Sequence, residues 1–191
     1  MISIENDILN PIRLNKKRKL DWLNLWIKKS DYIAYCCDSI RKKYSIIDES
    51  IDYYIVMMEM AIYYIKEYSD YYDYVYIQHN IIMDNNTYIK EDIKERDFSE
   101  YLKYLFYKKY DFDYISNLLE KNSNRFNYYL VGIRLLFPSY YLFYLERIII
   151  DNKDYDKLIE VVNCTLEYEK YLKRVIGVIN KFLIKKIVLP F

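Results

Sequence analysis

The chain has 191 residues and a formal net charge of +1. This length lets one domain bury a core, and the near-neutral charge gives no field that would draw the chain to nucleic acid or to an anionic membrane. Hydrophobic residues make up 53% and charged residues 30%, which excludes a disordered chain. With two glycines and three prolines, the composition favours helices over a β-sandwich or a dinucleotide-binding fold.

The cysteines and the N-terminus bear on the location of the protein. Three cysteines, of which Cys36 and Cys37 are adjacent, do not make a disulfide framework. The polar N-terminus has no apolar stretch of the kind that a signal peptide needs. The sequence therefore predicts a cytoplasmic protein.

The first half of the chain is predicted to be helical after a short irregular N-terminal segment. Residues 1–17 have no periodic pattern and are expected to be irregular, whereas residues 18–191 are expected to form a single helical domain. Apolar residues near helical spacing predict helices over residues 18–43 and 49–68. The basic residues 16–19 are interpreted as the solvated start of the first helix.

Residues 70–95 have a different pattern. Short runs of valine, isoleucine and tyrosine lie on both sides of Asp84, Asn85 and Asn86, which are typical turn residues. We expect a small β-hairpin near residues 74–92, and no other β structure in the chain.

Helical patterns return in the second half. Helices are predicted over residues 97–109 and 112–121, followed by the apolar run Tyr128–Leu145. This run contains Arg134 and Pro138, so it predicts a buried helix broken at the proline and not a membrane span.

The last predicted helix covers residues 155–185, with a bend near Gly177. No internal repeat and no segment of linker composition interrupts the chain. The predicted fold class is therefore mainly α, with one small β-hairpin.

Five segments suggest a family when they are taken in order. They read SIDYYIVMMEMAIYYI, IQHNII, DIKERDFSEYLK, YYLVGIRLLFPSYYLFYLE and YEKYLKRVIGVINKFL. Together they resemble the C-terminal lobe of the spore-coat kinase-like family of the CotS and YutH type. That family belongs to the aminoglycoside-phosphotransferase and protein-kinase fold, so the resemblance implies a helical kinase-like C-lobe.

The resemblance also implies positions for catalytic groups, and several of them are degenerate here. Phosphoryl transfer needs an Asp as the base, and an Asn and an Asp to hold Mg²⁺. The catalytic-loop position reads His79-Asn80, with no Asp two residues after the histidine, and the metal-binding position falls near Asp92. Asp97 matches an Asp of the family and is interpreted as a structural helix cap.

Other features weigh against catalysis. Asp84 with Asn85 and Asn86 could in principle supply a base and metal ligands, but a turn is sufficient to explain these residues. Residues 1–17 contain no glycine-rich phosphate loop and no strand lysine of the kind that an N-terminal lobe supplies. His79 is the sole histidine, so no zinc site is expected. We expect no enzyme activity, no cofactor and no metal.

Three functions follow from these observations. The first is a non-catalytic protein related to spore-coat components, which associates with other proteins during spore-coat assembly in the cytoplasm or in the coat itself. The second is half of a split kinase, in which a separate N-lobe joins and Asp84 or Asp92 carries the chemistry. The third is a viral Bcl-2-like helical protein that binds a host factor, a fold in which a hairpin has no place.

The expected partner is a protein or a second copy of the chain. A kinase-like C-lobe without its N-lobe leaves the side of the catalytic loop uncovered, and such apolar surfaces usually meet a partner. The side chains expected to be partly exposed there are Val75, Ile77, Ile81, Ile82 and Tyr88.

Overall fold

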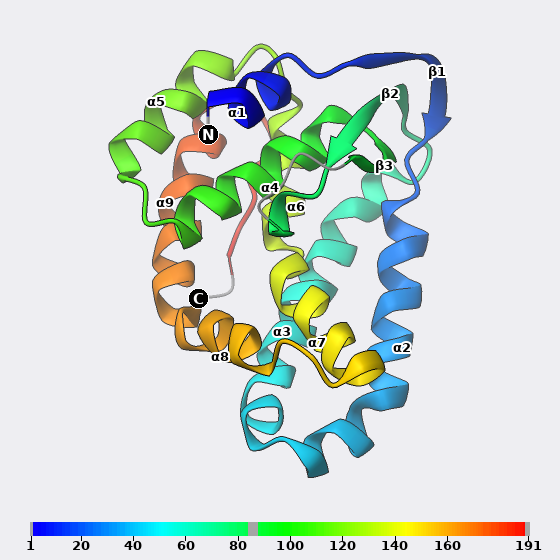
Figure 1. Cartoon of the computed structure of the whole chain (residues 1–191). Coiled ribbons are helices and arrows are strands. Elements are labelled where there is room, and N and C mark those ends of the chain that lie inside the picture. The colour runs from blue at the N-terminus through cyan, green and yellow to red at the C-terminus, as the bar shows by residue number, and fades with distance from the viewer. Residues whose placement is uncertain (1, 84–87, 190–191) are drawn as a thin grey trace.

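The computed structural model describes residues 2–83 and 88–189. It shows a helical body with a small sheet at one end (Figure 1). The elements in chain order are α1 (Ile2–Leu9), β1 (Arg13–Lys19), α2 (Trp22–Lys43), α3 (Ser45–Ile65), the 3-10 turn η1 (Lys66–Tyr68), β2 (Tyr72–His79), the 3-10 turn η2 (Ile81–Met83), β3 (Tyr88–Asp92), α4 (Lys94–Tyr107), α5 (Phe112–Asn122), α6 (Tyr128–Leu136), α7 (Ser139–Asp151), α8 (Tyr155–Asn163) and α9 (Thr165–Lys181). The mainly α prediction is confirmed.

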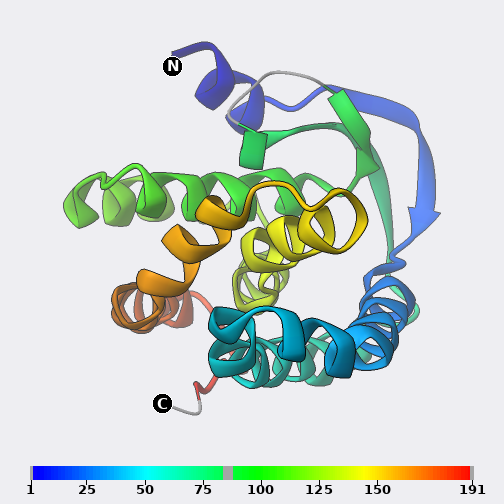
Figure 2. The same ribbon diagram turned by 60° about the horizontal axis from the view of Figure 1, so that its bottom comes forward.

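The sheet is antiparallel, with strand order β1-β2-β3. Its β2–β3 pair places Tyr76 opposite Asp92, and this confirms the hairpin expected near residues 74–92. The third strand, β1, was not expected. Figures 1 and 2 both show it running beside β2 on the outside of the molecule.

The N-terminal segment is therefore ordered, and the prediction that residues 1–17 are irregular is wrong. The expected helix start at the basic residues is wrong as well, because these residues belong to β1. Arg13 and Lys17 lie over the ring of Tyr74, at 3.9 and 4.6 Å from its centroid. Such cation–π contacts and the pairing with β2 come from distant residues, so a local pattern could not reveal them.

The new strand changes the surface expected beside the hairpin. Val75 and Ile81 are each only 2% exposed, so their predicted exposure is wrong. Ile77 and Ile82 are half-buried, and the side chain of Tyr88 lies outside the described part of the structure. This side of the molecule is therefore not the open apolar face that was expected.

Helix α6 is central to the helical body. It packs against α3, α4 and α9, and all nine of its residues are buried. The Asn127 side chain caps its start by accepting hydrogen bonds from the backbone N–H groups of Tyr129 and Leu130. The helix ends at Leu136, and α7 begins at Ser139 just after Pro138, which confirms the predicted break.

The last helix differs from the prediction. The predicted range holds two helices, α8 and α9, which meet at Cys164, and α9 continues through Gly177 and ends at Lys181. At the junction, the Thr165 hydroxyl donates to the Val162 carbonyl at 2.7 Å and lies 2.8 Å from the Tyr54 hydroxyl. The break between α8 and α9 therefore lies at a tertiary contact with α3 and not at a glycine.

Burial of α6 predicts a large cost for Leu136→Ala. Leu136 is fully buried, so its truncation should lower the free energy of unfolding by about 2–5 kcal/mol. Leu166→Ala is the matched control, because Leu166 is 68% exposed and its truncation should cost about 0.5 kcal/mol or less. Urea unfolding of both variants measures the difference. Equal stabilities of the two variants would contradict the central place of α6.

Candidate functional site

His79 and Asp97 meet at the junction of β2 and α4. One carboxylate oxygen of Asp97 lies 2.7 Å from the Nδ1 atom of His79 and accepts the backbone N–H of His79 at 2.9 Å. The other oxygen accepts a hydrogen bond from Arg96 at 3.0 Å. All three side chains are buried. This carboxylate therefore joins the end of the strand to the helix.

The expected helix-cap role of Asp97 is wrong. The residue at the N-cap position of α4 is Ile93, and no side chain caps this helix. Asp97 is the fourth residue of α4, and its carboxylate is bonded to His79 and Arg96. A carboxylate placed there serves tertiary structure, because it bonds His79 of β2, which lies outside its own helix.

Asp92, at the end of β3, is bonded to α2. The indole N–H of Trp22 donates to both carboxylate oxygens, at 2.9 and 3.1 Å, and the Ile93 backbone N–H donates to one of them at 2.9 Å. Lys90 Nζ lies 3.6 Å from the same carboxylate. These donors fix the orientation of the carboxylate and tie it to α2.

The remaining positions of the expected loop contribute less. Asn80 is half-buried, and its backbone carbonyl accepts the N–H of Met83 in η2 at 3.2 Å. Asp84, Asn85 and Asn86 lie outside the described residues. Within the described residues, no three His, Cys, Asp or Glu side chains come together as a metal site would require.

A second cluster of buried charges joins α4 to α6 and α7. Glu100 accepts hydrogen bonds from Arg134 Nε at 2.8 Å and from the Ser139 hydroxyl at 2.7 Å. Lys103 donates to the Ser139 oxygen at 2.8 Å and to the Phe137 carbonyl at 2.6 Å, and it lies 3.5 Å from Glu100. We call these four side chains, of Glu100, Lys103, Arg134 and Ser139, the buried charge cluster.

Burial and the neighbouring charges have opposite effects on the pKa values of Glu100 and Lys103. Burial by itself would raise the pKa of Glu100, but the cations Lys103, Arg134 and Arg96 and the Ser139 hydrogen bond outweigh burial and lower it to about 2. Burial lowers the pKa of Lys103 to about 7, although the neighbouring Glu100 opposes this change. The carboxylate thus stays charged, and the lysine titrates near neutrality.

The sequence held one signal for this cluster. Arg134 stands in an otherwise apolar run, and a buried guanidinium needs an acid. Glu100 and Lys103 gave no signal of their own, because an acid and a lysine three residues apart on a helix usually mark a solvated face. Sequence reasoning therefore missed Glu100, Lys103 and Ser139.

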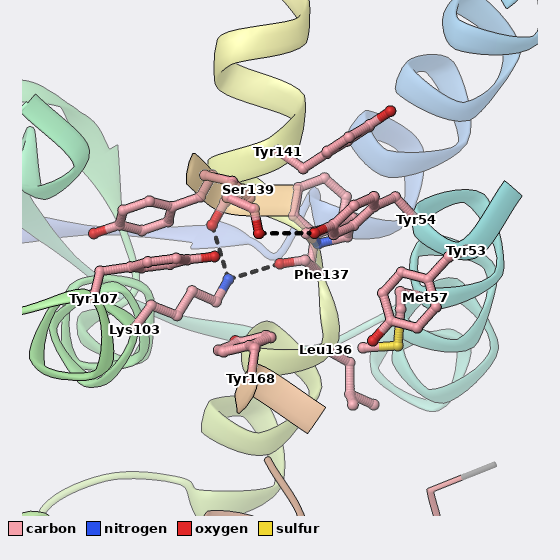
Figure 3. A pocket seen from close by; sticks show the side chains of 13 residues that line it. Tyr53, Tyr54, Met57, Lys103, Tyr107, Leu136, Phe137, Ser139, Tyr141 and Tyr168 are labelled. Atoms are coloured by element: carbon pink, nitrogen blue, oxygen red, sulfur yellow. Dashed lines mark hydrogen bonds between the residues drawn. The ribbon is translucent and has the colours of Figure 1, made fainter. Parts of the chain in front are cut away.

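A cavity of about 20 Å³ lies beside Lys103 (Figure 3). The buried hydroxyls of Tyr53 and Tyr140 line it and have no hydrogen-bond partner among the described residues. A cavity of this size has room for about one water molecule. Aromatic rings make up most of its wall: Tyr53, Tyr54, Tyr107, Tyr140, Tyr141 and Tyr168. The cavity is too small for an organic substrate.

A larger opening, which we call the α2–α7 groove, has a volume of about 410 Å³. The side chains that line it come from α2, α7, the end of α6 and β3. They are Trp22, Leu25, Trp26, Lys28, Lys29, Tyr32, Lys90, Arg134, Phe137 and Glu146. Aromatic rings and cations thus dominate its surface, with a single acid.

Comparison of the chain with protein-family models, curated proteins and solved structures gives no match in any of the three. Among the helices of residues 2–83 and 88–189, none combines the length and the apolar character that a membrane span requires.

The pKa of Lys103 predicts a rise of stability with pH. The unfolded chain keeps the lysine proton up to a pH of about 10.5, whereas the folded chain releases it near pH 7. Between these values the unfolded state binds more protons, so the free energy of unfolding should rise by up to about 1.4 kcal/mol per pH unit. Urea unfolding between pH values of about 7 and 8 measures this slope below the ordinary pKa values of cysteine, about 8.5, and of tyrosine, about 10.

The control for this slope is a pair of lysine variants. Lys103→Met should remove the slope, whereas Lys170→Met, at an exposed position of α9, should keep it. The prediction is contradicted if the unchanged chain and Lys103→Met have the same dependence of stability on pH. That result would mean that Lys103 has the pKa of a lysine in water.

Proposed function

We propose that the chain is a non-catalytic, kinase-like helical protein that acts by binding another protein. The observation that carries the proposal is the state of Asp92, at the position where the resemblance would put a metal-binding residue. Both of its oxygens are engaged by Trp22, and one of them also by the Ile93 backbone N–H. Phosphoryl transfer depends on carboxylates that are free to hold Mg²⁺ against the phosphates.

The His79 position supports the same conclusion. A catalytic base must lie within reach of the substrate hydroxyl. Here the histidine is 4% exposed, and Asp97 binds both its ring and its backbone N–H. These contacts stabilise the fold between β2 and α4, and they hold both His79 and Asp97 in the interior.

The order of the elements is compatible with the resemblance to a kinase-like C-lobe. The paired helices α2 and α3 precede the hairpin that carries His79 and Asp92, and α4 with Asp97 follows it. A role in spore-coat assembly rests on this resemblance to the spore-coat kinase-like family, and it remains part of the proposal because fold likeness does not fix function.

Exposed apolar side chains support protein association. Helix α2 alone exposes Leu25 by 43%, Ile27 by 39%, Tyr32 by 38% and Tyr35 by 90%. Leu25, Tyr32 and Tyr35 are seven and three positions apart and share one side of α2, and a contiguous exposed apolar patch is typical of a surface that meets a partner.

The two alternatives have less support. A split kinase would use Asp92 as a metal ligand, whereas this carboxylate is tied to Trp22, an indole that is 1% exposed. A Bcl-2-like bundle has no place for a sheet, whereas β1, β2 and β3 form one here. The described residues therefore favour the first proposal.

The proposal predicts that Mg²⁺-ATP does not stabilise the protein. A ligand raises the melting temperature only when it binds the native state, so millimolar Mg²⁺-ATP should shift the melting temperature by less than about 1 °C. Differential scanning fluorimetry measures the shift, and Asp92→Asn serves as the control. A clear Mg²⁺-dependent rise that Asp92→Asn removes would refute the non-catalytic proposal and favour a split kinase.

A further inference from the structure

The α2–α7 groove combines an apolar helix face with cations. Leu25, Lys28, Lys29 and Tyr32 follow one another on α2 at intervals of three, one and three residues, so they share one side of the helix. Leu25 and Tyr32 expose 43% and 38% of their surfaces. The two apolar side chains thus flank the two lysines along one wall of the groove.

The acids of the groove do not neutralise its cations. Glu146 of α7 is the single acid among the residues that line it, and it already forms an ion pair with Lys29. Lys28 is exposed and forms no ion pair with any residue in the described part of the chain. Lys90 lies 3.6 Å from Asp92, a carboxylate that the Trp22 indole also engages. The groove therefore keeps an excess of positive charge.

Arg134 provides the specific feature of this groove. Its side chain is 8% exposed, and its guanidinium lies over the rings of Trp22, Trp26 and Phe137 at 5.4, 5.7 and 5.1 Å. The Nε atom donates to Glu100, and no residue in the described ranges accepts a hydrogen bond from the two Nη atoms. A fixed guanidinium with free Nη donors matches the paired oxygens of a carboxylate.

We propose that the α2–α7 groove docks an acidic segment of a partner protein. An Asp or Glu side chain of the partner binds the Nη donors of Arg134 between Lys28 and Lys90, and a neighbouring apolar side chain packs on Leu25 and Tyr32. This inference rests on the proposed protein-binding function and adds the chemistry of the partner.

The dimensions of the groove favour a peptide segment over a free acid. Leu25 and Tyr32 are seven positions apart on α2, which corresponds to about 10 Å along a helix. An extended peptide covers this length with about three residues. A small acid could occupy the Arg134 end, but it would leave the apolar wall open to water.

Fluorescence anisotropy with a labelled peptide tests the inference. The probe is a short fluorescein-labelled peptide in which glutamates flank one leucine and one phenylalanine, and the control peptide has glutamine in place of each glutamate. We expect the full chain to bind the glutamate peptide at least about tenfold more tightly than the control. Added salt should weaken this binding, because the contacts involve charges at a partly exposed site.

Variants of the groove locate the binding. Lys28→Glu and Leu25→Ser each change an exposed side chain of α2, so the fold should be kept. Each substitution should lower the affinity for the glutamate peptide by roughly tenfold. Lys170→Glu, with the same change of charge on α9, should leave the affinity unchanged.

Three results would overturn the docking inference: equal binding of the two peptides, equal weakening by Lys28→Glu and Lys170→Glu, or full competition by free glutamate at the concentration of the peptide. None of them bears on the absence of Mg²⁺-ATP binding, so the docking inference can fail while the non-catalytic proposal stands.

Discussion

The charge of Glu100 is the constraint on which the rest of the helical body depends. A carboxylate that is 2% exposed is costly unless it is paired and hydrogen-bonded, and here Arg134, Lys103 and Ser139 supply its partners. These partners belong to α4, α6 and the start of α7, so a packing that separated the three helices would leave buried charges unpaired. The turn at Pro138 matters for the same reason, because it brings Ser139 back toward α4.

The same logic extends to the sheet. Asp97 fixes the end of β2 to α4, and Asp92 fixes the end of β3 to α2. The resemblance would put Asp92 at a metal-binding position, whereas here its carboxylate accepts hydrogen bonds from Trp22 and from the Ile93 backbone. Under the proposed non-catalytic function the chain acts through its surface, where Arg134 links the interior to the α2–α7 groove.

The sequence could predict those elements whose signals are local. The helical periodicity, the hairpin around the turn residues and the break at Pro138 all follow from neighbouring residues. Strand β1 could not be predicted, because Arg13–Lys19 has no strand pattern and is held by Tyr74 and Glu91 of the other strands. The junction at Cys164 likewise depends on Tyr54. In the candidate site, the position of Arg134 in an apolar run indicated a buried ion pair. Its partner Glu100 could be identified only from the packing of α4 on α6.

The direct test of this account is the stability of the buried charge cluster itself. Glu100→Gln leaves Arg134 and Lys103 buried without their acid, and it should lower the free energy of unfolding by about 3–5 kcal/mol. The triple variant Glu100→Leu, Lys103→Met and Arg134→Met removes all three charges together and should lose less than the single variant, because no charge is left unpaired. Urea unfolding of the two variants compares them. A single variant that loses less than about 1 kcal/mol would show that these charges do not hold the helices together, and would contradict the account.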